Sequence, residues 1–157
     1  MAACGGGGAS LPEPPACPTV APLPSPATGQ QGGTQRYLQA VATGQTRVTT
    51  PGRLFLDRWP TRKFSRTAEF REDLVRTSDD AVCFAQQLIS IPPPSARFEE
   101  YDAALDGVLS QFIEDLAVGR EAARQRNVSK FRDWLKVIDE LPGKLALVDA
   151  TRPSARP

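Results

Sequence analysis

Apolar side chains recur every three or four positions along most of the chain after residue 34, which is typical of helices that bury one face. No stretch alternates in the manner of a strand, and no segment repeats. The spacing predicts four stripes of core residues. They are Tyr37, Val41, Gly44 and Val48; Phe70, Leu74, Thr77 or Ser78, Ala81, Phe84 or Ala85, and Leu88; Phe98, Tyr101, Leu105, Val108, Phe112, Leu116 and Ala123; and Phe131, Leu135, Ile138, Leu141, Leu145 and Val148.

Residue types that start or stop helices separate these stripes. Thr34 is placed to cap a first helix over residues 35–48. Thr50 and Pro51 then predict a break, with Thr50 as the N-cap and Pro51 as the first residue of a short piece that ends near Trp59. A single helix that continues through the proline with a kink fits the same residues.

Serines mark the later starts, and prolines mark the later stops. The run Pro92–Pro94 ends the helix before it, and Pro142 with Gly143 is expected to kink or divide the last helix. Glu99 lies close to the position that completes a capping box with the serine before it. The predicted N-caps are Ser65, Ser95 and Ser129.

These patterns predict an all-α fold, an antiparallel up-down bundle of three or four helices over residues 34–150. Residues 151–157 are expected to fray. Residues 1–33 are expected to form a disordered tether, because residues 5–33 hold seven of the 15 prolines, seven of the 12 glycines and a single charge, Glu13. Such a composition buries too little apolar surface to offset the entropy of ordering.

The composition also removes several kinds of chemistry. Histidine is absent, and with it the commonest general base and metal ligand. The net charge of +1 provides no overall field for nucleic acid. We therefore expect no catalytic residues, no metal, no cofactor and no nucleic-acid partner, and we interpret the protein as non-enzymatic.

The first five residues, Met1-Ala2-Ala3-Cys4-Gly5, resemble the end of a bacterial lipoprotein signal, in which small residues precede a cysteine that receives a lipid. The resemblance implies a thioether-linked diacylglycerol on Cys4, with residues 5–33 as the tether. It departs from that family in one respect, since only three residues precede Cys4 and the apolar part of a signal would have to lie upstream of Met1.

A second stretch, residues 88–94 (LISIPPP), followed by Phe98, Tyr101 and Leu105, is similar to small helical lipoproteins of uncharacterised function. In those proteins a Leu-x-x-Leu/Ile-x-Pro-Pro turn joins two long helices, and a histidine often lies near the Tyr101 position. Tyrosine at that position departs from the pattern. The similarity implies a shared helical fold over about residues 70–148.

The other two cysteines, Cys17 and Cys83, form an even pair once Cys4 is set aside. In an exported protein they are expected to form a disulfide that pins the tether to the bundle. In a cytosolic protein Cys83 would be a small buried side chain and Cys17 a free thiol. The spacing of the two residues does not decide between these alternatives.

Two groups of charges are candidates for a role at the surface. The cations between residues 36 and 66 are opposed by Asp57 alone, so they either face anionic lipid headgroups or pair with the acidic helix that begins near Glu99. Glu99, Asp102 and Asp106 share one helical face, which we interpret as solvated. The cations are Arg36, Arg47, Arg53, Arg58, Arg62, Lys63 and Arg66, and the aromatic residues among them, which we interpret as core or hinge fillers, are Phe55, Trp59 and Phe64.

The sequence thus favours a lipid-anchored protein of the bacterial cell envelope, on the outer face of the cytoplasmic membrane or the periplasmic side. Its membrane contact would be the lipid on Cys4, and its bundle would bind an unknown protein or small molecule. The alternative is a cytoplasmic helical adaptor or complex subunit with a disordered N-terminal tail.

Overall fold

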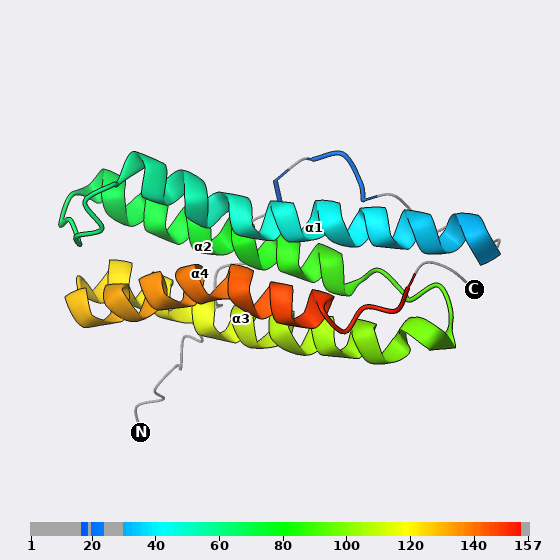
Figure 1. The fold of residues 1–157 in the computed structure, drawn as a ribbon. Coiled ribbons are helices and arrows are strands. Elements are labelled where there is room, and N and C mark those ends of the chain that lie inside the picture. Colours follow the sequence, from blue (N-terminus) through cyan, green and yellow to red (C-terminus); the bar gives the residue numbers. More distant parts are fainter. Residues whose placement is uncertain (1–16, 19, 24–29, 155–157) are drawn as a thin grey trace, which may run out of the picture.

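The computed structural model of the chain describes residues 17–18, 20–23 and 30–154. This part contains four long helices and one short 3-10 turn, and it contains no strand. The elements are α1 (Gln30–Arg58), α2 (Ala68–Ile89), η1 (Ala96–Phe98), α3 (Glu99–Gln125) and α4 (Val128–Asp149). Figure 1 shows the long helices lying lengthwise beside one another. The predicted all-α bundle is therefore confirmed, and it is a bundle of four helices.

Short connections decide which helices are neighbours. Residues 59–67, 90–98 and 126–127 join successive helices, so each helix runs antiparallel to the one before it. α1 packs on α2, α2 on α3 and α3 on α4, whereas α4 closes back on α1 through a smaller contact. Arg126 allows the tight turn between α3 and α4 by adopting a left-handed conformation, with φ of 52°.

The first helix is longer than the sequence indicated. α1 passes through Pro51, so the predicted break is wrong and the alternative of one continuous helix holds. Pro51 and Gly52 are both buried, and a Cβ on Gly52 would lie 2.6 Å from Cγ2 of Ile138 on α4. This packing outweighs the local tendency of proline to stop a helix. α1 also begins at Gln30, so Thr34 lies inside the helix and is not its cap.

Two predicted N-caps are displaced by two residues. Thr67 caps α2 where Ser65 was expected, and Asn127 caps α4 where Ser129 was expected. Thr67 Oγ1 accepts a hydrogen bond from the backbone N–H three residues later at 3.3 Å, and Asn127 Oδ1 does the same at 3.1 Å. Threonine and asparagine suit the position as serine does, so the cap residue alone does not fix where a helix starts.

The middle of the chain departs from the prediction at one cap. α2 ends at Ile89, as the run Pro92–Pro94 predicts. α3 begins at Glu99 itself, so Glu99 does not complete a capping box, and the Ser95 side chain makes no capping bond ahead of η1. Pro142 lies inside α4 and does not divide it.

Aromatic rings fill the end of the bundle where α1 turns into α2. The ring centroids of Phe55 and Trp134 lie 4.9 Å apart, and those of Phe70 and Phe131 lie 5.3 Å apart, both edge to face. The interpretation of the aromatics near the α1–α2 connection as core or hinge fillers agrees with these contacts. The cluster consists of Phe55, Trp59, Phe64, Phe70, Phe131 and Trp134.

Two linked hydrogen bonds lie inside the core where α2, α3 and α4 meet. Trp134 Nε1 donates to Ser78 Oγ at 3.0 Å, and the Ser78 hydroxyl donates to the Leu74 carbonyl at 2.9 Å, so both buried polar groups are satisfied. Gly119 lets α3 approach this pair, because a Cβ there would lie 2.5 Å from Trp134 Cδ1. The predicted α4 stripe takes Leu135 in place of Trp134, whereas the structure buries Trp134 fully and Leu135 only in part.

We expect Gly119→Ala to lower the free energy of unfolding by about 1–3 kcal/mol, because the added methyl meets both the tryptophan ring and the Ser78 hydroxyl. Gly107 is the matched control on the same helix, since a Cβ there meets nothing within 4 Å. Gly107→Ala should raise the stability by about 0.5–1 kcal/mol. Urea unfolding of the two variants measures both effects, and a stabilised Gly119→Ala variant would contradict the packing described.

Candidate functional site

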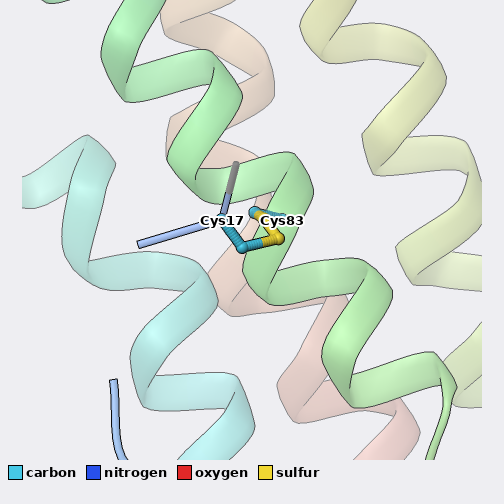
Figure 2. Close-up of a disulfide and its surroundings, with 2 residues drawn as sticks. All are labelled: Cys17 and Cys83. Carbon is cyan, nitrogen blue, oxygen red and sulfur yellow. A yellow bond between two sulfur atoms is a disulfide. The ribbon is translucent and has the colours of Figure 1, made fainter. Parts of the chain in front are cut away.

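The predicted attachment point, Cys4, lies outside the described residues, as does most of the tether. Cys17 and Cys83 lie within them and are joined by a disulfide, with Cα atoms 5.5 Å apart (Figure 2). Cys83 is buried on α2, and Cys17 is exposed. Leu23 packs against the core, so the chain ahead of α1 folds back on the bundle at two points.

A groove of about 570 Å³ lies along α2 and the end of α3. This volume falls in the range of small-molecule sites. Its wall carries four guanidinium groups, two from each helix, and three carboxylates from α2. The arginines are Arg71, Arg76, Arg120 and Arg124, and the carboxylates are Glu72, Asp79 and Asp80.

Two of the four arginines are already engaged with carboxylates. Arg120 forms an ion pair with Asp79, which links α3 to α2. Arg76 lies 2.5 Å from Asp73, a buried carboxylate that also accepts bonds from Arg58 at 2.7 Å and from Trp59 Nε1 at 3.1 Å. The charge of these two arginines is therefore largely balanced inside the protein.

The other two arginines are balanced less directly: after the larger effect of Lys130, Arg124 helps to lower the pKa of Glu121, and Glu72 follows Arg71 on α2. Arg71 and Arg124 form no ion pair with any carboxylate that the structure describes. The Nε atom of Arg71 is buried and has no hydrogen-bond acceptor within the described chain. A buried donor without an acceptor costs free energy, and such groups in native proteins usually have a partner.

The rest of the groove is partly apolar, and its carboxylates lie both beside Arg71, at Glu72, and farther along α2, at Asp79 and Asp80. Ala68, Val75 and Ala123 supply its apolar surface. Burial raises the pKa of Asp80, and the neighbouring Asp79 carboxylate raises it further, against the opposite effect of Arg76.

The cations between residues 36 and 66 are partly paired, but with other partners than expected. Arg58 pairs with Glu69 and Asp73 on or beside α2, and Arg62 pairs with Asp139 on α4. The expected pairing with the helix that begins at Glu99 is wrong for these two. The four arginines of the groove lie outside residues 36–66. No local sequence pattern predicts that they come together, because two separate helices supply them.

A hydrogen-bonded network lies toward the other end of the bundle. The Tyr37 hydroxyl donates to Asp102 at 2.6 Å, and the Tyr101 hydroxyl donates to Asp149 at 2.6 Å. Gln45 Nε2 also donates to Asp149, at 3.1 Å. Burial, then the bonds to carboxylates, raise the pKa of both tyrosines well above the ordinary value.

The face of α3 that we interpreted as solvated is solvated only in part. Glu99 is exposed, whereas Asp102 and Asp106 are half-buried. Burial, together with the nearby Asp102 carboxylate, raises the pKa of Asp106 to about 6. Within residues 17–18, 20–23 and 30–154, no three histidine, cysteine or carboxylate side chains come together in a way that could hold a metal ion.

Searches of protein-family models, of curated proteins and of solved structures returned no match to this chain. Among the helices whose residues are described, none combines the length and the apolar character needed to cross a membrane.

We expect Asp106 to make a contribution to the stability of the fold that falls as the pH rises from about 4 to about 6. Its folded pKa of about 6 lies above the ordinary aspartate value, so the folded state holds the proton more tightly. The stability that comes from this tighter proton binding is fully present below pH 4 and is lost as Asp106 ionises. Asp106→Asn should therefore stabilise the protein at pH 7 and leave it nearly unchanged at pH 4.

Urea unfolding at the two pH values measures this effect. Glu114→Gln, on the exposed face of the same helix, is the matched control and should not alter the difference between them. If both variants changed the difference in unfolding free energy between pH 4 and pH 7 equally, Asp106 would not be the cause of that difference.

Proposed function

We propose that this chain is a lipid-anchored protein of the bacterial cell envelope, in which a lipid on Cys4 holds a non-enzymatic helical bundle that binds a small ligand in the α2–α3 groove. The bundle is the binding part, and the segment ahead of it is the tether. The ligand and the anchor use separate parts of the chain, so the two halves of the proposal have separate tests.

The disulfide between Cys17 and Cys83 is the observation that carries the envelope assignment. Disulfides persist in exported proteins, whereas the reducing cytosol keeps most thiols free. In a cytoplasmic adaptor, the alternative interpretation of the sequence, the reducing compartment would keep Cys17 and Cys83 as free thiols. The bond therefore favours export over the cytoplasmic alternative.

The disulfide also sets where the tether joins the bundle. Without it, the first described contact with the bundle after Cys4 is at Leu23; with it, the chain is held at Cys17, by the bond to Cys83 on α2. Residues 5–16 then separate the lipid from the bundle, and twelve residues reach at most about 40 Å when fully extended. A diacylglyceryl group supplies the two acyl chains that stable attachment requires.

A binding role agrees with the chemistry of the groove. Its lining consists of arginines, carboxylates, alanines and one valine, all of which the structure describes. This set includes no hydroxyl or thiol nucleophile with a base beside it, the arrangement that hydrolytic or transfer chemistry uses. What the set offers is charge and an apolar surface, which are suited to holding a ligand.

Protein purified from its native cells should yield a peptide that starts at Cys4 and carries a diacylglyceryl group, because the proposed anchor is a thioether at that residue. The protein should also enter the detergent phase on phase partitioning. Mass spectrometry checks the first expectation, and immunoblotting of the two phases checks the second.

The matched variants for this test are Cys4→Ser and Cys17→Ser, introduced at the native gene. Cys4→Ser should move the protein to the aqueous phase, and Cys17→Ser should leave it with the detergent. An unmodified Cys4 in native protein would refute the anchor and leave the binding role of the groove to its own test.

Loss of the disulfide should lower the free energy of unfolding by about 2–4 kcal/mol, since the bond closes a long loop of the unfolded chain. We expect the lower end of this range, because the bond also restrains the segment ahead of α1 in the folded protein. Cys17→Ser tests this without changing the buried Cys83, and Cys4→Ser is the control. Unchanged unfolding of Cys17→Ser under oxidising conditions would contradict a formed bond.

A further inference from the structure

The cations of the α2–α3 groove are distributed unevenly along it. The ion pair between Asp79 and Arg120 fixes the two antiparallel helices side by side, so residues four later on α3 lie beside residues four earlier on α2. Arg124 is therefore placed about 6 Å, or one helical turn, from that pair, toward Arg71. By the same register Arg124 lies level with Val75, one turn short of Arg71, and Glu72 lines the groove between these two levels, whereas Asp80 lies at the far end.

The hydrogen-bond donors of Arg71 indicate that the ligand of the groove is an anion. The Nε atom of Arg71 is a buried donor without an acceptor among the described residues. A guanidinium group presents paired N–H donors that match the two oxygens of a carboxylate or the oxygens of a phosphate. A cationic ligand would meet the Glu72 carboxylate in this part of the groove, but it would leave the Arg71 donor unpaired and add repulsion from Arg124.

Part of the surface beside the two arginines is apolar, and the Glu72 carboxylate also lines it. Val75 lies on the same face of α2 as Arg71, one turn farther along, and Ala68 and Ala123 also line the groove. A free inorganic anion would contact the arginines and leave this surface in water. A molecule with an apolar body would cover it and exclude water from the ion pairs, which strengthens them.

We propose that the α2–α3 groove binds a small anionic amphiphile, a molecule with one carboxylate or phosphate group and an apolar body. Arg71 and Arg124 hold the anionic group, and Val75 with the two alanines contacts the apolar body. This assignment rests on the proposed binding role of the bundle and is independent of the anchor on Cys4.

The test is a titration of the isotope-labelled, oxidised full-length chain with octanoate, followed by NMR of its backbone amides. Octanoate should shift the signals of residues 68–80 and 120–124 in a saturable way, below the concentration at which it forms micelles. Octylammonium and octyl glucoside have an alkyl chain one carbon longer, with a positive charge or no charge, so their apolar contact with the groove is at least as large. Both should bind at least about tenfold more weakly, because neither satisfies the two arginines.

Matched double variants separate the site from the overall charge. Arg71→Gln with Arg124→Gln should weaken octanoate binding about tenfold or more. Arg36→Gln with Arg132→Gln removes the same charge at exposed positions outside the groove and should change the affinity by less than about twofold. Equal weakening by the two double variants would overturn the proposal.

The remaining outcomes distinguish this proposal from the broader function. Saturable binding of octylammonium or octyl glucoside in the groove, without octanoate, would overturn the anionic class and leave a binding groove. If inorganic phosphate bound as tightly as octanoate, the proposed contact between the apolar body of the ligand and the groove would be refuted. Groove signals that respond only to vesicles containing phosphatidylglycerol would replace the small ligand by a membrane surface. No response to any probe would overturn both the ligand class and the binding role.

Discussion

The hydrogen bond from Trp134 to Ser78, formed beneath Gly119, is the contact on which the arrangement of this bundle depends. It joins α2 and α4 across the core and admits α3 only at a residue without a side chain. A polar pair in an apolar core has few alternative partners, so a shift of α2 or α4 by one turn would leave the Trp134 N–H without its acceptor. A shift of α3 by one turn would bring a residue with a side chain to the place of Gly119. Apolar stripes alone would permit such a shift at smaller cost.

This fixed register has a direct consequence at the surface. Ser78 and Gly119 are followed immediately by Asp79 and Arg120, so the core contact brings that ion pair together. The pair in turn places Arg124 toward Arg71. The groove is thus determined by the buried contact beside it, and the placement of Arg71 and Arg124 in it is a property of the packing of α2 on α3 as well as of the sequence of either helix.

The stripes of apolar residues predicted the class of the fold and most of its core, because the 3.6-residue period depends only on which side chains avoid water. Helix ends were less predictable. Thr67 and Ser65 are equally good caps, and Pro51 argues for a break that burial against α4 overrides. The groove was not predictable at all, since it needs the register between two helices, which the Trp134 bond sets.

The buried charged and polar groups of the bundle are satisfied to different degrees, and this difference bears on where a ligand is expected. Two buried tyrosines donate to Asp102 and Asp149. Among the described residues, the Nε atom of Arg71 and the Nη1 atom of Arg47 are buried donors without an acceptor. Arg71 lines the open groove, where an external acceptor can reach its guanidinium group. A ligand in the groove therefore explains the unmet donor of Arg71 better than imperfect packing does.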